Sequence, residues 1–388
     1  MHLKKFLAVS TLVIVAGLVV VNHRQARAGE LTSTSGYHAL EPIRHGNLTV
    51  FPVVAAKSYS TGEFLTLDEG LRSGDVVVTE MGNVQGLRRR PGINPAGHDN
   101  AQVNQLVLIN NAKRPLLLLA GEIVSGGKQD RVIGKDRIVP AESDPVDLSV
   151  FCVEPGRWTE TSQNFGASES MYGNSGKSAG VSVGGAMPPA AIMAQPSVRA
   201  KAMADKDQQK VWDEVNKQRK VATETVEVTA TPPEIATELS STTSYARVNE
   251  NAAVKKQVDA VARPIEESYR SLIAQLRDRN AVGVVVAVNG RIIWADVFAS
   301  TDLLEKYWPK LVRSYASEAV GARGRGSDIA VSRAQSFLEN MEGRRETIES
   351  EPGIYRHTEI SGDGFKAFAL TSLLPRTNFD VHVAKMAE

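Results

Sequence analysis

Hydrophobic and polar residues follow different patterns in the two parts of the chain. Up to about residue 160, short apolar runs recur at intervals of roughly ten residues and are separated by turn residues, with few helical patterns. The main runs are 48–54, 75–80, 105–110, 115–120 and 146–153. Pro52 indicates that the first run is an edge strand or contains a bulge. Closely spaced strands without intervening helices favour an antiparallel sheet or a small sandwich.

The pattern after residue 199 mixes helical and extended segments. We predict helices at 199–220, 252–279, 301–320 and 332–340, and strands at 223–231, 282–288, 291–298, 365–373 and 379–383. Pro264 is expected to interrupt the second helix. Asn289-Gly290 is the strongest short hairpin pattern and joins two of the strands. The sequence therefore predicts an α+β protein, with an antiparallel β-rich core and the helices of the C-terminal half packed on one side.

Residues 163–198 separate the two parts and have low complexity. Within 166–187, glycine, serine and alanine fill 14 of 22 positions. We expect a flexible loop, because so little apolar area cannot offset about 1–2 kcal/mol of ordering entropy per residue. The β-rich half then spans 29–162 and the α+β half spans 199–388. The pattern leaves open whether the halves are two domains or complete one sheet together.

Residues 1–28 have the organisation of a secretory signal peptide. Lys4-Lys5 precede a mostly apolar, uncharged run at 6–21, and Ala26-Arg27-Ala28 places small residues where a signal peptidase cuts. The run is short for a membrane-spanning helix, which needs about 20 apolar residues. We therefore expect cleavage after Ala28 and a periplasmic or extracellular location. An uncleaved membrane anchor is the alternative.

Composition and charge exclude several classes of protein. Lys plus Arg is 45 and Asp plus Glu is 44, so the net charge of +1 lacks the basic surplus typical of nucleic-acid binding. A hydrophobic content of 42% excludes wholly disordered chains and polytopic membrane proteins. Cys152 is the single cysteine, which excludes an intrachain disulfide and a four-cysteine zinc site. We expect no nucleic-acid partner, no membrane contact after cleavage, and no metal or cofactor; the oligomeric state is not encoded.

Charged and polar residues concentrate in two turns that follow apolar strands. The first turn contains Gly121-Glu122 and 126–131, and the second is 152–158. Glu122 and Glu154 are candidates for a general acid and base, with Cys152 as a candidate nucleophile. The candidate ligand-binding residues are Lys128, Gln129, Arg131, Arg157, Trp158 and Asp296. Gly126-Gly127 would allow an anion to approach the backbone closely.

The same residues have a purely structural interpretation. Glu–Arg pairs could fix the turns between strands, with Cys152 as a small buried hydrophobe. Asp296 lies within an apolar strand pattern and would face either a site or solvent. The metal-compatible set His357, Glu359 and Asp363 is weak, because it contains a single histidine. The segment 171–178 is not a phosphate-binding loop, because Met171 stands where the first glycine belongs.

The turns "GE…GGKQDR" at 121–131 and "CVEPGRW" at 152–158 resemble a bacterial domain family. This family is the ARG and rhodanese-phosphatase superfamily-associated protein domain, where ARG denotes ADP-ribosylglycohydrolase. The strand with Trp294 and Asp296, and the helix with Ser314-Tyr315-Ala316, are also similar to it. The resemblance covers most of residues 40–385 and implies one elaborate domain. It also implies an association with nucleotide-related enzymes, and so a nucleotide- or ADP-ribose-related ligand, without an assigned activity.

Three functions fit these observations. The leading hypothesis is an exported binding module that holds a small anionic or polar ligand at Glu122, Lys128, Gln129, Arg131, Glu154 and Arg157. The first alternative is a hydrolase with Glu122 or Glu154 as general base and Cys152 as nucleophile. The second is a structural envelope or secretion-accessory protein.

Overall fold

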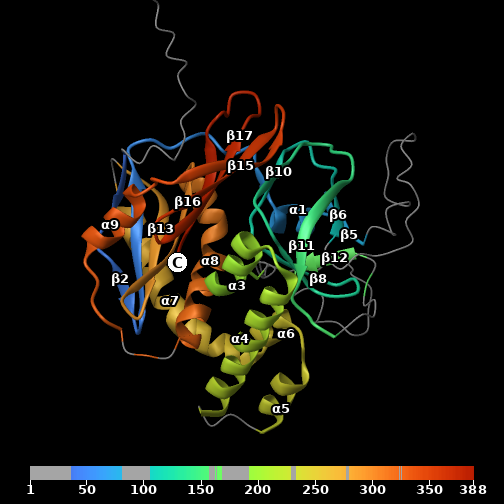
Figure 1. Cartoon of the computed structure of the whole chain (residues 1–388), viewed down its shortest axis with the longest axis vertical. Coiled ribbons are helices and arrows are strands. Elements are labelled where there is room, and N and C mark those ends of the chain that lie inside the picture. Colours follow the sequence, from blue (N-terminus) through green and yellow to red (C-terminus); the bar gives the residue numbers. More distant parts are fainter. Residues whose placement is uncertain are drawn as a thin grey trace, which may run out of the picture.

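The computed structural model describes residues 36–80, 105–156, 162, 164–167, 192–228, 233–276, 279–322, 324 and 326–388. Within these ranges the chain forms a nine-stranded sheet, a closed β-barrel beside it, and helices that connect and cover them (Figure 1). Every neighbouring pair in the nine-stranded sheet is antiparallel. The predicted α+β class is confirmed.

The nine-stranded sheet contains strands from both ends of the chain. Its order is β1-β3-β13-β14-β18-β17-β16-β15, with β2 also paired to β3. The strands are β1 (Tyr37–Ala39), β2 (Ile43–His45), β3 (Leu48–Ala55), β13 (Asn280–Val288), β14 (Arg291–Phe298), β15 (Arg344–Glu351), β16 (Tyr355–Gly362), β17 (Phe365–Ser372) and β18 (Asp380–Ala387). Because β3 pairs with β13, segments from the two ends of the chain share one sheet.

Strand β3 is an inner strand, so of the two alternatives predicted at Pro52 the edge is wrong; an irregularity does lie beside it, in the partner strand β13 between Ala281 and Gly283. On one side β3 pairs with β13, and on the other with β1 and β2. Pro52 lies opposite the break between β1 and β2, where its carbonyl accepts a hydrogen bond from the Leu40 N–H at 2.8 Å. The missing N–H of proline is tolerated here because it coincides with the interruption of the ladder between β1 and β2.

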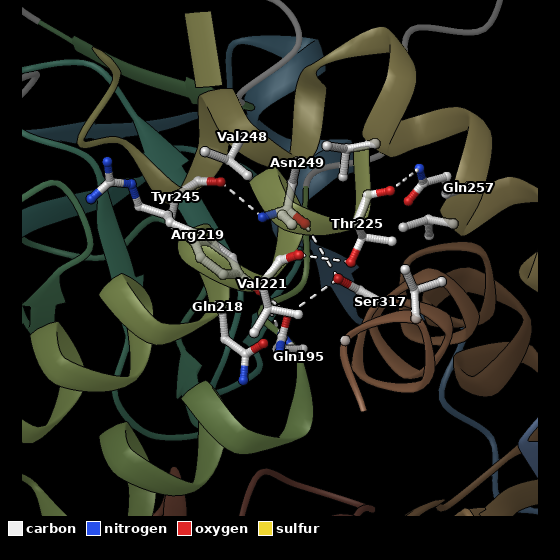
Figure 2. A pocket seen from close by; sticks show the side chains of 15 residues that line it. Gln195, Gln218, Arg219, Val221, Thr225, Tyr245, Val248, Asn249, Gln257 and Ser317 are labelled. Carbon is white, nitrogen blue, oxygen red and sulfur yellow. Dashed lines mark hydrogen bonds between the residues drawn. The ribbon is translucent and has the colours of Figure 1, made fainter. Parts of the chain in front are cut away.

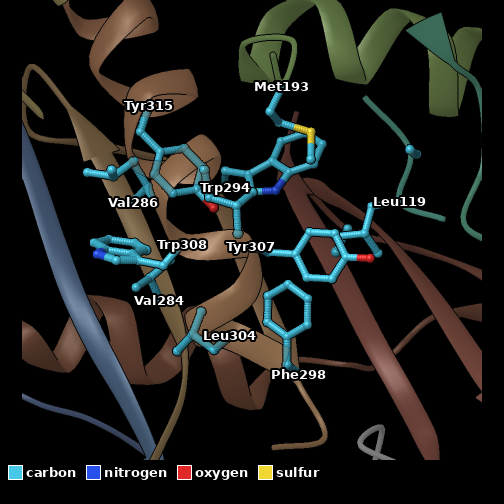
Figure 3. Packing of buried hydrophobic residues seen from close by; sticks show 14 of the residues in the cluster. Leu119, Met193, Val284, Val286, Trp294, Phe298, Leu304, Tyr307, Trp308 and Tyr315 are labelled. Carbon is cyan, nitrogen blue, oxygen red and sulfur yellow. The ribbon is translucent and has the colours of Figure 1, made fainter. Parts of the chain in front are cut away.

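Helices cover both faces of the sheet. The long helices α7 (Ala252–Gln275) and α8 (Thr301–Gly321) pack on one face, where the Trp308 and Tyr315 side chains of α8 meet Val284 and Val286 of β13 (Figure 3). The short helix α9 (Val331–Glu339) packs on the opposite face. The prediction of helices on one side holds for α7 and α8 but not for α9. Burial on two faces explains why all eight residues of β3 are buried.

The second β-layer is a closed barrel in the order β11-β6-β5-β12-β8-β9. Its strands are β5 (Val76–Thr79), β6 (Gln105–Asn110), β8 (Ile123–Ser125), β9 (Arg131–Ile133), β11 (Val146–Cys152) and β12 (Asn164–Ala167). A small sheet, β10-β7-β4, and helix α1 lie against it. These elements are β4 (Leu65–Thr66), α1 (Leu67–Ser73), β7 (Leu116–Leu118) and β10 (Arg137–Val139). Strand β12 closes the barrel and belongs to the segment predicted as a loop.

The remaining helices of the described residues lie between barrel strand β12 and sheet strand β13 along the chain. They are α3 (Pro196–Ala200), the π-helix η2 (Lys201–Asp205), α4 (Gln208–Val228), α5 (Pro233–Ser241) and α6 (Tyr245–Glu250). Residues 192–198, predicted as loop, are packed, since Ala194 and Val198 are fully buried. Residues 168–191 of that segment lie outside the described residues. No helix in the described ranges is both long and apolar enough to span a membrane.

Two helix predictions need correction. Helix α4 extends to Val228, so the predicted strand at 223–231 is wrong at least as far as that residue. The Thr223 and Thr225 hydroxyls donate to carbonyls four residues earlier, which lets these β-favouring residues lie within a helix. Helix α7 continues through Pro264 without ending.

Candidate functional site

The structure divides the predicted site residues among three buried clusters. Glu122 belongs to one, Gln129, Arg131 and Glu154 to another, and Asp296 to a third. Arg157 and Trp158 lie outside the described residues. Each cluster joins elements that are distant in sequence.

Glu122 lies in the turn before β8 and is fully buried. Its Oε2 accepts the Leu119 N–H at 2.7 Å, and its Oε1 pairs with Lys310 Nζ of α8. Lys310 also contacts Asp68 of α1 at 2.7 Å. Burial raises the pKa of the Glu122 carboxyl, although Lys310 acts in the opposite direction. Because both carboxyl oxygens are engaged and no solvent reaches them, this geometry supports a link between elements rather than a general base.

The two predicted turns meet at Asp130 and Glu154. The Asp130 N–H donates to Glu154 Oε2 at 3.1 Å, and Gln129 Nε2 donates to the Glu154 carbonyl at 3.1 Å. The hydroxyl of Ser244, the N-cap of α6, donates to Asp130 Oδ2 at 2.6 Å. The Gly126 N–H donates to Asp130 Oδ1 at 3.2 Å, so this backbone donor is satisfied within the turn. The turn at 126–131 is therefore held by hydrogen bonds within itself and to the N-terminus of α6.

Lys128, Arg131 and Cys152 complete this region. The backbone N–H of Lys128 donates to Glu80 Oε1 at 3.0 Å, and Arg131 is opposite Cys152 in the barrel ladder. Arg131 and Cys152 are both fully buried, and burial raises the pKa of the thiol. A reactive thiol needs access and a lowered pKa, so both observations count against Cys152 as a nucleophile.

Asp296, a predicted site residue, is the centre of the third cluster, whose members Arg199, Asp136 and His382 were not predicted. Arg199 of α3 binds its carboxylate in bidentate fashion, at 2.9 and 3.0 Å. The Tyr315 hydroxyl and His382 Nε2 also bind this carboxylate, and His382 Nδ1 lies 2.6 Å from Asp136 Oδ2. All five side chains are fully buried.

The charges of the third cluster compensate one another. Burial alone would raise the pKa of Asp296, but Arg199 and His382 hold it well below its usual range. Burial alone would lower the pKa of His382, but Asp136 and Asp296 raise it to about 9. The cluster therefore holds Arg199 and His382 as cations against two carboxylates. Such an arrangement fastens the barrel side of the molecule to β14 and β18 of the sheet.

A small cavity lies between helices α4, α6, α7 and α8, and Figure 2 shows the polar side chains around it. The Ser317 hydroxyl donates to Gln195 Oε1 at 3.1 Å, the Tyr245 hydroxyl lies 3.2 Å from the same atom, and Asn249 Nδ2 donates to the Tyr245 carbonyl at 2.8 Å. Its volume is about 30 Å³. This is room for only one or two water molecules, so the cavity is too small for a ligand.

A larger cavity of about 240 Å³ lies between the barrel and the edge of the nine-stranded sheet. We call it the barrel–sheet cavity. Its lining is Gly134, Lys135, Ser149 and Phe151 from the barrel side, Ala202, Met203 and Lys206 from η2 and its end, and Ile348, Glu349, His357 and Phe368 from the sheet. Among the described residues, none of the predicted site residues lines either cavity.

His357 is the unusual residue of the barrel–sheet cavity. The residue is 1% exposed, and neither ring nitrogen has a hydrogen-bond partner among the described residues. A buried polar group without a partner costs about 1–3 kcal/mol. Burial lowers the pKa of His357 to about 4, so the ring is neutral at pH 7. A molecule in the cavity is the nearest candidate for the missing partner.

Two lysines and one carboxylate give the lining a positive surplus. Lys135 pairs with Glu349, which also accepts the Tyr355 hydroxyl. Lys206 pairs with Glu359, just outside the lining, at 3.0 Å. Sequence analysis named His357 only as a weak metal ligand and did not single out either lysine. Within the described ranges, no three His, Cys, Asp or Glu side chains are grouped to hold a metal ion.

In the described ranges, buried charges join the barrel side to the nine-stranded sheet, and a cavity of about 240 Å³ lies between them, within an α+β fold. The model of the family described as ARPP-1, ARG and Rhodanese-Phosphatase-superfamily-associated Protein domain, matches residues 36–385, and the chain belongs to this family. The predicted resemblance is confirmed. No curated protein and no solved structure matches the chain.

Proposed function

We propose that this protein is an exported binding module that holds a small anionic or polar ligand in the barrel–sheet cavity. One observation carries the proposal: His357, which is fully buried and whose two ring nitrogens find no partner among the described residues, lines a cavity of about 240 Å³. A buried imidazole without a partner lowers stability, and such costs persist mainly where they serve function. The cavity therefore replaces the turns at 121–131 and 152–158 as the proposed binding site.

The cavity size limits the ligand. Sites for drug-sized molecules have volumes of roughly 300 Å³ or more. The barrel–sheet cavity, at about 240 Å³, is smaller than such sites. A whole ADP-ribose is larger than this space. The family association suggests a ligand related to nucleotides. Only a part of such a ligand, for example its sugar phosphate, would fit inside the cavity.

The other parts of the proposal rest on the sequence and on burial. Export is supported by the signal-peptide pattern at 1–28, and a buried Cys152 suits an oxidising compartment. The hydrolase alternative finds no support, because Glu122 and Cys152 are fully buried and engaged within the protein. Glu154, the other predicted base, is also buried and accepts the Asp130 N–H.

The proposal is tested by replacing His357 with phenylalanine. His357→Phe keeps a ring beside Phe368 and removes both unpartnered nitrogens. We expect the variant to be more stable by about 1–3 kcal/mol without ligand, because the buried polar cost disappears. We also expect it to lose the increase in Tm that the wild type shows with one or more of acetate, benzoate, phosphate and ribose 5-phosphate.

The matched control is His45→Phe, at an exposed position of β2 outside the cavity. This variant should keep the ligand-induced shift. The proposal is wrong if no probe shifts the wild-type Tm, or if His357→Phe melts lower and retains every shift.

A further inference from the structure

We infer that the ligand of the barrel–sheet cavity is a small monocarboxylate with an apolar body, and that Lys206 binds its carboxylate. This inference rests on the proposed function and specifies its ligand class. Four observations support it: the backbone at Lys206, the ion pairs around Glu359, the apolar lining, and the neutral histidine.

The backbone places Lys206 at the cavity in an uncommon conformation. Lys206 ends the π-helix η2, and its N–H donates to the Lys201 carbonyl at 3.0 Å. Its φ of 53° lies in the left-handed region, which lysine rarely adopts. Single π-helical turns and left-handed residues other than glycine cluster at functional sites. The same turn contributes Ala202 and Met203 to the lining, so η2 shapes one wall of the cavity.

The ion pairs around Glu359 leave Lys206 able to turn towards a ligand. The Lys206 side chain is 48% exposed and pairs with Glu359 Oε2, while Lys366 Nζ lies 3.3 Å from Glu359 Oε1. If Lys206 turns into the cavity, Glu359 keeps Lys366 as its counter-charge. Lys135 is different. If it turned towards a ligand, Glu349 would keep the hydrogen bond from the Tyr355 hydroxyl but would lose its ion pair with Lys135. The cavity can therefore supply one positive charge, which matches a monoanion.

The rest of the lining fits an apolar body. Phe151 and Phe368 are aromatic, and Met203 and Ile348 add flexible aliphatic surface. His357, neutral at pH 7, can donate one N–H to a carboxylate and cannot supply a second positive charge. A dianion would bring one uncompensated negative charge into this partly buried space, which is costly.

The test compares three probes that share a phenyl ring: benzoate, benzamide and phenyl phosphate. Benzamide has nearly the shape of benzoate without its charge, and phenyl phosphate is a dianion near pH 7. Binding of each probe is measured by titration calorimetry to the wild-type protein, to Lys206→Asn and to Lys210→Asn. Asparagine tolerates the left-handed conformation of position 206. Lys210 is a nearby exposed lysine of α4 that does not line the cavity.

We expect the wild type to bind benzoate about tenfold or more tightly than either other probe, the size of effect of one charge-assisted hydrogen bond. Lys206→Asn should remove this preference by weakening benzoate alone, and Lys210→Asn should preserve it. If Lys206→Asn weakens benzamide equally, Lys206→Gly, which has no left-handed strain, decides between loss of charge and loss of the turn.

The outcomes separate the inference from the proposed function. Tighter binding of benzamide or phenyl phosphate, or an unchanged benzoate preference in both Lys206 variants, overturns the monocarboxylate inference and leaves the binding function standing. Failure of all three probes to bind the wild type at millimolar concentration overturns the monocarboxylate inference. The binding function falls as well only if acetate, phosphate and ribose 5-phosphate also leave the wild-type Tm unchanged.

Discussion

Gly121 shows how one residue can hold a buried charge cluster in place. Its φ is +97°, and a Cβ built there would lie 2.5 Å from Cγ and 2.8 Å from Nε of Arg199. Arg199 is fixed at the same point, because its Nε donates to the Ala120 carbonyl at 3.2 Å while its terminal nitrogens bind Asp296. The backbone at Ala120 and Gly121 is therefore occupied by the Arg199 side chain.

This contact leads to a stability prediction for Gly121→Ala. The matched control is Gly156→Ala, because Gly156 has a similar φ of +92° and no atom of the described residues lies within 4 Å of a built Cβ. Both variants share the backbone cost of positive φ. We expect Gly121→Ala to unfold in urea with a free energy at least about 2 kcal/mol lower than Gly156→Ala, because Arg199 must move. Equal losses in the two variants would show that the contact with Arg199 relaxes freely.

The spacing of hydrophobic residues predicted helices and strands well where an element buries one face. It predicted them poorly where a segment has both a helical and an alternating pattern. The Asn289-Gly290 hairpin and helix α8 follow from alternation and from an apolar stripe. Helix α4 does not, because the alternating Thr and Val residues near 223–228 imitate a strand, although Val226 is buried by packing of the helix. Strand β15 was missed because its residues are charged and largely exposed at the edge of the sheet.

The candidate site was predicted only in part, for a similar reason. Sequence order shows that turns follow strands, so the meeting of Asp130 and Glu154 was foreseeable. It does not show which distant groups arrive from other elements. Three cations from distant elements each neutralise a buried carboxylate. Lys310 of α8 pairs with Glu122, Arg199 of α3 pairs with Asp296, and His382 of β18 pairs with Asp136. The cavity is likewise formed by three separate parts of the molecule, the barrel side, η2 and the sheet, whose spacing no local pattern encodes.

The N-terminal segment carries a prediction of its own. The basic pair Lys4-Lys5, the apolar run at 6–21 and the small residues Ala26 and Ala28 have the order of a cleaved signal peptide. N-terminal sequencing of protein released from cells should therefore begin at Gly29. Material that remains membrane-bound with Met1 intact would instead support the uncleaved anchor.

Buried charges between barrel and sheet make the stability of the whole molecule depend on pH. The pKa of His382 is raised from 6.5 to about 9 by Asp136 and Asp296. Stabilisation from His382 is therefore fully present below about pH 6.5 and is lost as the pH rises through about 9, since the folded state binds the extra proton. This stabilisation from His382 acts between the barrel side and the nine-stranded sheet, because Asp136 precedes β10 and His382 lies in β18.

We expect His382→Gln to unfold with a free energy about 3–5 kcal/mol lower at pH 6, because two buried carboxylates lose a cation. The difference from wild type should shrink between pH 7 and pH 10. Chemical denaturation across this range measures it, with exposed His45→Gln as the control for replacing a histidine. Parallel stability curves for wild type and His382→Gln would mean that His382 is not charged in the folded protein.

The order of strands in the nine-stranded sheet also sets when the protein can fold. Strand β18 is the last element of the chain, yet it lies inside the sheet between β14 and β17, and β3 from near the beginning pairs with β13. A chain that emerges from its N-terminus cannot close this sheet until β18 has emerged. Until then, β14 and β17 expose open edges that invite pairing with other chains. Such long-range pairing is slow to form, so these edges are open to aggregation until β18 has paired.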